Sequence, residues 1–189
     1  METATAVVAG IVRGITPFDA VEQAHRDETL TWLASTDDIF RRRKPATPTP
    51  HLVSYIVPVD PDGRALLLGR HRLSGLWLPP GGHVEPAEHP RAAAEREARE
   101  ELGRPADFTV LGPDPLFLTV NPIRDRLGGH VDISLWYLTR ADRKADWQLD
   151  PREFDGGSWW DIDRFGLPES DPHLPRFIAK LDAGLAACP

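Results

Sequence analysis

The residues best suited to chemistry lie in one glutamate-rich segment that begins with a pair of glycines and ends at Gly103. If its charged half is a helix, Glu97, Glu100 and Glu101 lie within an arc of about 100° on one face. Like charges three or four residues apart each cost a helix about 0.2–0.5 kcal/mol. Hard divalent cations such as Mg²⁺ prefer carboxylate oxygens as ligands. The spacing therefore predicts a site for a divalent cation.

The alternative interpretation is a solvated surface helix held by ion pairs. Glu95 and Arg99, and likewise Arg96 and Glu100, have the spacing of four residues that such pairs need. Two features favour the metal site. The apolar positions of the helix are nearly all alanines, which let it lie close to a loop. The glycines that precede it allow a close approach of the backbone.

The segment resembles the Nudix box, G-x5-E-x7-R-E-U-x-E-E-x-G-U, where U is a bulky aliphatic residue. All seven fixed positions are present: Gly82, Glu88, Arg96, Glu97, Glu100, Glu101 and Gly103. The resemblance covers about residues 51–165, including the stretch from Trp77 to Gly81. The two aliphatic positions differ, being Ala98 and Arg104, and His89 stands where a serine or threonine N-cap is frequent. These departures concern local packing more than catalysis.

The resemblance implies an α/β fold, namely a Nudix-like α/β/α sandwich with a mixed sheet. It also implies Mg²⁺-dependent hydrolysis of a nucleoside diphosphate linked to another group, by attack of water at phosphorus, with Mn²⁺ as a substitute ion. The implied metal ligands are the helix glutamates and a backbone carbonyl: Glu97, Glu100, Glu101 and Gly82. Arg96 is implied to hold these carboxylates and to contact Glu88. Glu88, Gly81 and Gly103 are expected to be structural.

A general base is expected outside the box, as in many members of the family. Glu153, shortly before a strand that carries tryptophans, resembles such a residue. Asp155 and a carboxylate within the box are the alternatives. Proton removal from a metal-activated water needs only weak assistance from a base.

Three further residues are candidate substrate contacts. His130 and Asp132 are two apart on a predicted strand, so they face the same side and could contact substrate or metal. The alternative is a polar face of an edge strand. Trp77 offers a flat surface for a base, as do Trp136 and Trp159, although an aromatic residue in a strand usually packs in the core.

The elements that position these residues form one main domain with an appendage. We expect three segments: a helical N-terminal extension over 1–44, a proline-rich linker over 45–50, and the Nudix domain with its C-terminal helix over 51–189. Within the extension we predict a helix from Thr16, capped by that residue, and a second short helix over 37–43. The extension packs on the main domain or, alternatively, serves dimerisation or covers the substrate. The remaining predictions are strands over 51–60, 64–72, 107–120, 130–139 and 157–161, and helices over 90–102 and from about 172.

The amino-acid composition limits the classes of binding partner and indicates the cellular compartment of the protein. The 189 residues are 41% hydrophobic, and the net charge of −7 disfavours nucleic acid and anionic membranes as partners. One cysteine, Cys188, excludes an internal disulfide framework. The absence of a long apolar run and of a basic leader predicts a cytoplasmic protein. The expected partner is a small nucleoside diphosphate derivative, and a homodimer is possible.

Two other functions are compatible with the same fold. A catalytically inactive nucleotide-binding regulator usually lacks box carboxylates, and here all are present. An isopentenyl-diphosphate-isomerase-like enzyme relies on a cysteine in its site, whereas this cysteine lies beside the C-terminus. The metal-dependent hydrolase is therefore the main prediction, with its particular substrate open.

Overall fold

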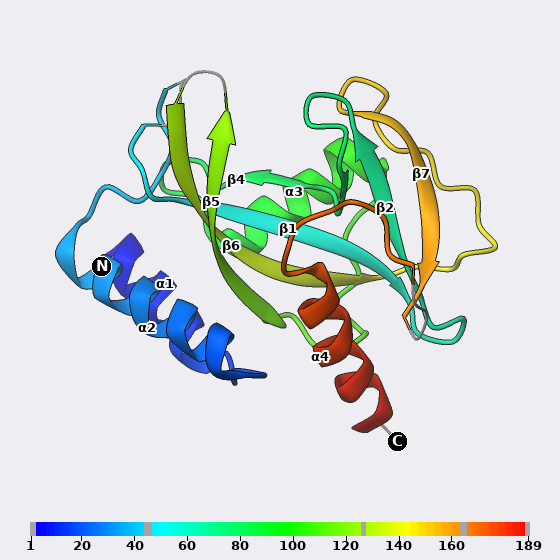
Figure 1. The fold of residues 1–189 in the computed structure, drawn as a ribbon, viewed down its shortest axis with the longest axis horizontal. Helices are drawn as coiled ribbons and strands as arrows, with labels where there is room; N and C mark the ends of the chain where they lie inside the picture. The colour runs from blue at the N-terminus through cyan, green and yellow to red at the C-terminus, as the bar shows by residue number, and fades with distance from the viewer. Residues whose placement is uncertain (1–2, 44–46, 126–127, 163–165, 188–189) are drawn as a thin grey trace.

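A computed structural model describes residues 3–43, 47–125, 128–162 and 166–187 (Figure 1). In chain order the helices and strands are α1 (Ala4–Gly14), α2 (Ala20–Ser35), β1 (His51–Asp60), β2 (Ala65–His71), β3 (Trp77–Leu78), β4 (Gly81–His83), α3 (Pro90–Leu102), β5 (Phe117–Asp125), β6 (Gly128–Arg140), β7 (Phe154–Asp161) and α4 (Leu174–Ala187). No helix among the described residues is long and apolar enough to cross a bilayer.

The strands form one seven-stranded mixed sheet in the order β3-β2-β1-β6-β5, with β4 added to β1 and β7 added to β2. Strands β1 and β6 run parallel, and the other pairs are antiparallel. On its other side β1 is shared by two partners. It pairs with β4 over Val53 to Tyr55 and with β2 only at Val59 and Asp60. This sharing places the start of the box directly beside the central strand.

Helices cover both faces of the sheet (Figure 1). Side chains alternate along β1, so Leu52 and Ile56 belong to one buried cluster, and Val57 and Val59 to the other. The first cluster includes residues of α1, α2 and α3, and the second includes one face of α4. The predicted α/β/α sandwich with a mixed sheet is therefore confirmed.

Helix α3 begins and ends where the sequence predicts. The His89 ring performs the capping role, because its Nδ1 accepts a hydrogen bond from the Arg91 N–H at 3.1 Å. Pro90 fills the first helical position, and Gly103 ends the helix with a φ of +64°. The unusual residue at position 89 thus leaves the helix start capped.

The N-terminal region differs from the prediction in three ways. Residues 4–14 form a helix of their own, α1. The second helix begins at Ala20 rather than Thr16, because the Asp19 carboxylate caps it by accepting from the N–H groups of Val21 and Glu22. The short helix predicted over 37–43 is absent. In that segment Ile39 is fully buried instead, and its carbonyl accepts from the Leu52 N–H.

The strand predicted over 107–120 is also shorter, because β5 begins only at Phe117. The preceding residues form turns, in which Asp107 accepts a hydrogen bond from the Thr109 N–H and Gly112 has a φ of +100°. Such local side-chain bonds compete with the ladder of a sheet.

The N-terminal helices share the core of the main domain. Val8, Val12 and Leu33 lie in the same buried cluster as Leu52 of β1. The extension therefore packs on the main domain. The boundaries 1–44, 45–50 and 51–189 stay a prediction, and residues 44–46 at the start of the linker lie outside the described residues.

Candidate active site

The glycine pair of β4 makes room for a carboxylate of α3. A Cβ on Gly82 would lie 2.3 Å from Glu97 Oε1, so only glycine lets this carboxylate approach β4 so closely. Gly81 has a φ of +150°, and a Cβ there would lie 2.4 Å from the carbonyl oxygen of Ser54 in β1. Both glycines are therefore dictated by packing, as expected from their place before the helix.

Arg96 joins the loop to the helix through hydrogen bonds to five oxygen atoms on four residues. Its guanidinium binds Glu88 in a bidentate manner, with Nε–Oε1 and Nη2–Oε2 distances of 3.0 and 3.1 Å. Nη1 lies 2.6 Å from Glu97 Oε1 and 3.2 Å from Glu100 Oε2. Nη2 also donates to the carbonyl of His83 at 3.1 Å. The geometry matches the positioning role that the resemblance implies for Arg96 and Glu88.

The charges around Arg96 reinforce this arrangement. Burial opposes ionisation of Glu88, but the hydrogen bonds from Arg96 and from the Glu85 N–H outweigh it, so the pKa of Glu88 is lowered. The same Glu88 contact raises the pKa of Arg96. The pair is thus a fixed ionic link between the loop and α3.

Two of the three helix glutamates are buried and disfavoured as anions. Burial raises the pKa of Glu101 to about 8; the charges of Glu97 and Glu153 act in the same direction, and a 2.7 Å hydrogen bond from the Gly81 N–H opposes it. Burial likewise raises the pKa of Glu97 in spite of its contact with Arg96. Glu100 is exposed.

These features fit a divalent cation. The donor atoms are carboxylate oxygens, which hard cations prefer. The charge of Glu97 raises the pKa of Glu101, and the charge of Glu100 raises the pKa of Glu97, so a cation here would offset repulsion between the carboxylates. The roles of Glu97, Glu100, Glu101 and the Gly82 carbonyl as metal ligands stay predictions.

The loop before β7 brings Glu153 toward the same cluster. The Asp150 N–H donates to the Glu101 carbonyl at 2.9 Å, which ties the loop to the end of α3. Glu153 is half exposed, its Oε2 lies 3.9 Å from His71 Nε2, and its charge raises the pKa of Glu101. Asp155 instead pairs with Arg72 at 3.1 Å. Of the two loop candidates for the base, the geometry favours Glu153.

The expected substrate contacts lie in two different places. His130 Nε2 lies 3.4 Å from Asp132 Oδ1, so these two residues do share a face of β6. Trp77 is half-buried at the edge of the second core cluster, where its ring contacts that of Trp160. Trp136 is fully buried, so it packs in the core as the alternative interpretation held. Substrate binding by His130, Asp132 and Trp77 stays a prediction.

Sequence reasoning missed two histidines beside Asp132. His51 Nε2 lies 2.9 Å from Asp132 Oδ1, and the His51 ring lies 4.8 Å from that of His83. The signal for His83 was its place directly after Gly82. His51 gave a weaker one, as a polar residue at the start of an apolar strand.

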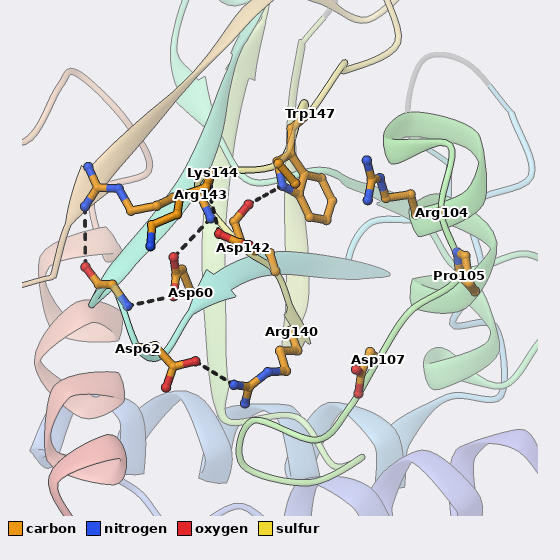
Figure 2. A pocket seen from close by; sticks show the side chains of 13 residues that line it. Asp60, Asp62, Arg104, Pro105, Asp107, Arg140, Asp142, Arg143, Lys144 and Trp147 are labelled. Atoms are coloured by element: carbon orange, nitrogen blue, oxygen red, sulfur yellow. Dashed lines mark hydrogen bonds and ion pairs between the residues drawn. The ribbon is translucent and has the colours of Figure 1, made fainter.

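A large pocket lies outside the candidate active site (Figure 2). Its volume is about 760 Å³, and none of its lining residues belongs to the segment 82–103. Four cationic side chains line it, opposite four carboxylates. Arg140 pairs with Asp62 at 2.7 Å, and the Arg143 N–H donates to Asp60 at 3.0 Å (Figure 2). Because its charges are matched within the lining, we do not assign the phosphate groups of a substrate to this pocket.

Comparison with known proteins identifies the family. The NUDIX domain model matches residues 49–181. An RNA pyrophosphohydrolase from Gluconacetobacter diazotrophicus is 33% identical over 116 residues, and the match covers 56% of this chain and 68% of that relative. The chain belongs to the NUDIX family. It is a hydrolase that acts on diphosphate bonds.

Solved structures agree on the fold. A MutT protein from Methanosarcina mazei Go1 superposes with a TM-score of 0.53 and 21% identity, covering 70% of this chain and 92% of its own. A MutT NUDIX hydrolase from Burkholderia pseudomallei gives 0.51 and 24%, covering 69% and 95%. The Ap4A hydrolase of C. elegans gives 0.50 and 20%, covering 71% and 97%. In each case the matched part is about two thirds of this chain and nearly all of the neighbour.

Proposed function

We propose that the protein is a Mg²⁺-dependent nucleotide pyrophosphatase. It cleaves the diphosphate linkage of a small nucleoside diphosphate derivative by attack of water at phosphorus. The observation that carries this proposal is the convergence of Glu97 and Glu101 on the glycine pair of β4, with Arg96 bound to Glu88 beside them. The names of two relatives, an RNA pyrophosphohydrolase and an Ap4A hydrolase, support a substrate with a phosphate chain attached to a nucleoside.

The side chains of the candidate site have separate roles in this reaction. Glu97, Glu100 and Glu101 hold the cation, and Arg96 keeps Glu97 and Glu88 in place. A bound cation would neutralise phosphate oxygens and lower the pKa of water, so that water gives up a proton more easily when it attacks phosphorus. Glu153 accepts the proton of that water, because it is half exposed and close enough to raise the pKa of Glu101. No covalent intermediate is required.

The first experiment identifies the substrate. Purified protein with Mg²⁺ or Mn²⁺ is given nucleoside triphosphates, ADP-ribose, nucleotide sugars, a dinucleoside tetraphosphate and a 5′-triphosphorylated RNA oligonucleotide, and products are identified by mass. We expect cleavage of a small nucleotide, with ¹⁸O from labelled water in one phosphate-bearing product. Cleavage of the 5′-triphosphorylated RNA alone would show that the substrate is an RNA end and not a small nucleotide. Absence of turnover on every substrate would support the inactive nucleotide-binding regulator.

The second experiment tests the residue roles. Glu100→Gln should abolish most turnover without unfolding the protein, because the residue is exposed and serves the cation. Glu153→Gln should lower kcat by about 10²-fold, the smaller end of the range for a general base. Asp155→Asn is the matched control in the same loop and should stay near the wild-type rate. A larger loss for Asp155→Asn than for Glu153→Gln would transfer the role of base to Asp155.

A further inference from the structure

A second cluster of metal-ligating side chains lies where three strands meet. His51 is the first residue of β1 and pairs in register with Asp132 of β6, while His83 ends β4 on the other side of β1. One ligand atom from each of these three residues lies within 4.8 Å of the others. The cluster is distinct from the glutamates of α3.

The hydrogen bonds of His51 determine which of its nitrogens is available. Its Nδ1 lies 2.7 Å from the carbonyl oxygen of Pro48. A carbonyl oxygen only accepts, so Nδ1 carries the proton, and in the neutral ring Nε2 presents a lone pair. That lone pair faces Asp132 Oδ1 at 2.9 Å. Two acceptor atoms at this distance repel each other unless a proton or a metal ion lies between them.

The same three atoms are buried without hydrogen-bond partners. They are His51 Nε2, His83 Nε2 and Asp132 Oδ1. His51 itself has no exposed surface, although buried polar atoms in proteins are nearly always paired. A carboxylate oxygen and two imidazole nitrogens that lie close together without a hydrogen bond form the pattern that a metal ion would complete.

We propose that His51 Nε2, His83 Nε2 and Asp132 Oδ1 bind a divalent transition-metal ion of the zinc class. Two imidazoles and a carboxylate form a ligand set that Zn²⁺ prefers, whereas Mg²⁺ prefers oxygen ligands alone. The Pro48 carbonyl orients His51 in the way that carbonyls commonly orient metal-binding histidines.

The geometry needs only small adjustments to accept the ion. The ligand atoms of tetrahedral zinc lie about 3.3 Å apart for bonds of about 2.0 Å. Binding therefore separates the closest pair slightly and draws the most distant pair together by about 1.5 Å. The His130 ring stacks on His51 with centroids 5.4 Å apart, and its Nε2 is 3.4 Å from Asp132 Oδ1, so His130 is a fourth donor within reach.

The ion would hold β4 from the side opposite to the active site. Gly82 precedes His83 in the chain, and the His83 carbonyl accepts a hydrogen bond from Arg96. A metal bond to His83 would thus fix the strand that carries the glycine pair. The competing explanation is a polar network without a metal ion, in which a protonated His51 pairs with Asp132 and Arg41 adds its positive charge.

The test measures metal binding directly. Full-length protein is stripped with a chelator and titrated with Zn²⁺ by calorimetry in the presence of saturating Mg²⁺. A parallel titration with Co²⁺ follows visible absorption, which reports low-symmetry coordination by nitrogen and oxygen. We expect one equivalent of Zn²⁺, with affinity lowered at least about 10–100-fold in Asp132→Asn and in His83→Gln.

Two variants serve as controls. Glu100→Gln alters the active-site carboxylates and should bind Zn²⁺ as the wild type does. His25→Gln removes a half-buried imidazole whose Nδ1 is buried without a hydrogen bond. This ring packs edge-on against His173, and the variant should also leave Zn²⁺ binding unchanged. Thermal melts without metal establish that each variant is folded.

Three results would overturn the proposal. The first is no Zn²⁺ binding to the folded wild-type protein. The second is undiminished binding to both Asp132→Asn and His83→Gln. The third is loss of binding in Glu100→Gln alone, which would place the ion at the active-site glutamates instead.

Discussion

At the scale of single residues, the absence of a side chain on Gly82 determines where the Glu97 carboxylate lies. Gly82 has no Cβ, and the Glu97 carboxylate occupies the space where that atom would be. Glu97 is thereby held 2.6 Å from Arg96 while remaining largely buried. The position of one predicted metal ligand thus depends on a residue that has no side chain.

Gly82→Ala should therefore impair catalysis more than folding. The added methyl group displaces Glu97, and we expect kcat to fall at least about 10²-fold, because small displacements of catalytic groups have costs of this size. Turnover and Mg²⁺ affinity are measured beside the melting temperature. Gly10→Ala in α1, where an added Cβ meets nothing within 4 Å, controls for replacing a glycine without a steric clash. Near-wild-type turnover of Gly82→Ala would show that Glu97 does not act from this position.

Glu101 makes the stability of the metal-free protein depend on pH. Its pKa rises from an ordinary 4.5 to about 8, chiefly through burial. Between these pH values the native state binds the proton and the unfolded state does not, so stability falls as pH rises from about 4.5 and levels off above about 8. Glu101→Gln removes this cost and can still accept the Gly81 hydrogen bond.

The fall in stability with rising pH gives the prediction for Glu101→Gln. Without metal, the variant should be more stable than the wild type at pH 8.5 and nearly equal to it at pH 4.5. Urea unfolding in chelator at the two pH values measures the difference. An equal difference at both pH values would contradict the elevated pKa. Added Mg²⁺ should reverse the order at high pH, because only the wild type binds the ion with its full ligand set.

At the scale of elements, α3 and the loop before it act as one unit. The helix is capped at both ends, and its alanines let it lie against β1, where Ser54 Oγ donates to the Pro90 carbonyl. Arg96 connects the helix to Glu88 and to the His83 carbonyl. The unit needs a planar donor with several N–H groups, which lysine cannot provide.

Arg96→Lys should accordingly lower both activity and stability. Loss of the bidentate contact should cost about 1–3 kcal/mol of unfolding free energy, the value of one or two hydrogen bonds to charged groups. Denaturant unfolding and kcat are measured together. The control is Arg99→Lys, on the exposed side of the same helix, which should change neither quantity appreciably. Wild-type stability of Arg96→Lys would mean that the guanidinium fork is not required.

At the scale of the whole molecule, buried ionic contacts tie the first helices to the last. Glu22 of α2 has no exposed surface and accepts from the N–H groups of Phe18 and Leu118. Lys180 of α4 reaches both of its oxygens, at 2.8 and 2.9 Å. Burial lowers the pKa of Lys180 in spite of this partner. The N-terminal helices are thereby part of the fold.

Lys180→Met should destabilise the protein by about 3–5 kcal/mol, because it leaves Glu22 as a buried anion without its cation. The double variant Glu22→Gln/Lys180→Met should recover part of that loss, since it removes the buried charge. Glutamine keeps one oxygen that accepts from the Phe18 or the Leu118 N–H, so the recovery is incomplete. Urea unfolding of the two single variants and the double variant forms a thermodynamic cycle. Additive losses would show that the pair is not coupled.

The glutamate-rich segment and the helix that carries it could be predicted from the sequence alone. The spacing of Glu97, Glu100 and Glu101 is a property of the helical repeat, and caps and glycines are local signals, so the helix over 90–102 and its carboxylate face could be derived without a structure. Strands β1, β2 and β6 followed from apolar runs, whereas β4, which contains the glycine pair, was not predicted. The start of α2 was missed because Asp19 and Thr16 are both possible caps, and only packing selects between them.

Contacts between residues far apart in the chain could be identified only from the tertiary structure. His51, His83 and Asp132 are separated by 32 and 49 residues in the chain, and the register of β1 with β4 and β6 brings them together. The same holds for Glu22 and Lys180, and for Glu153 and Glu101. Local periodicity fixes which face of a strand or helix is buried, but it does not say which distant strands pair or where a helix docks, because these depend on the packing of the complete core.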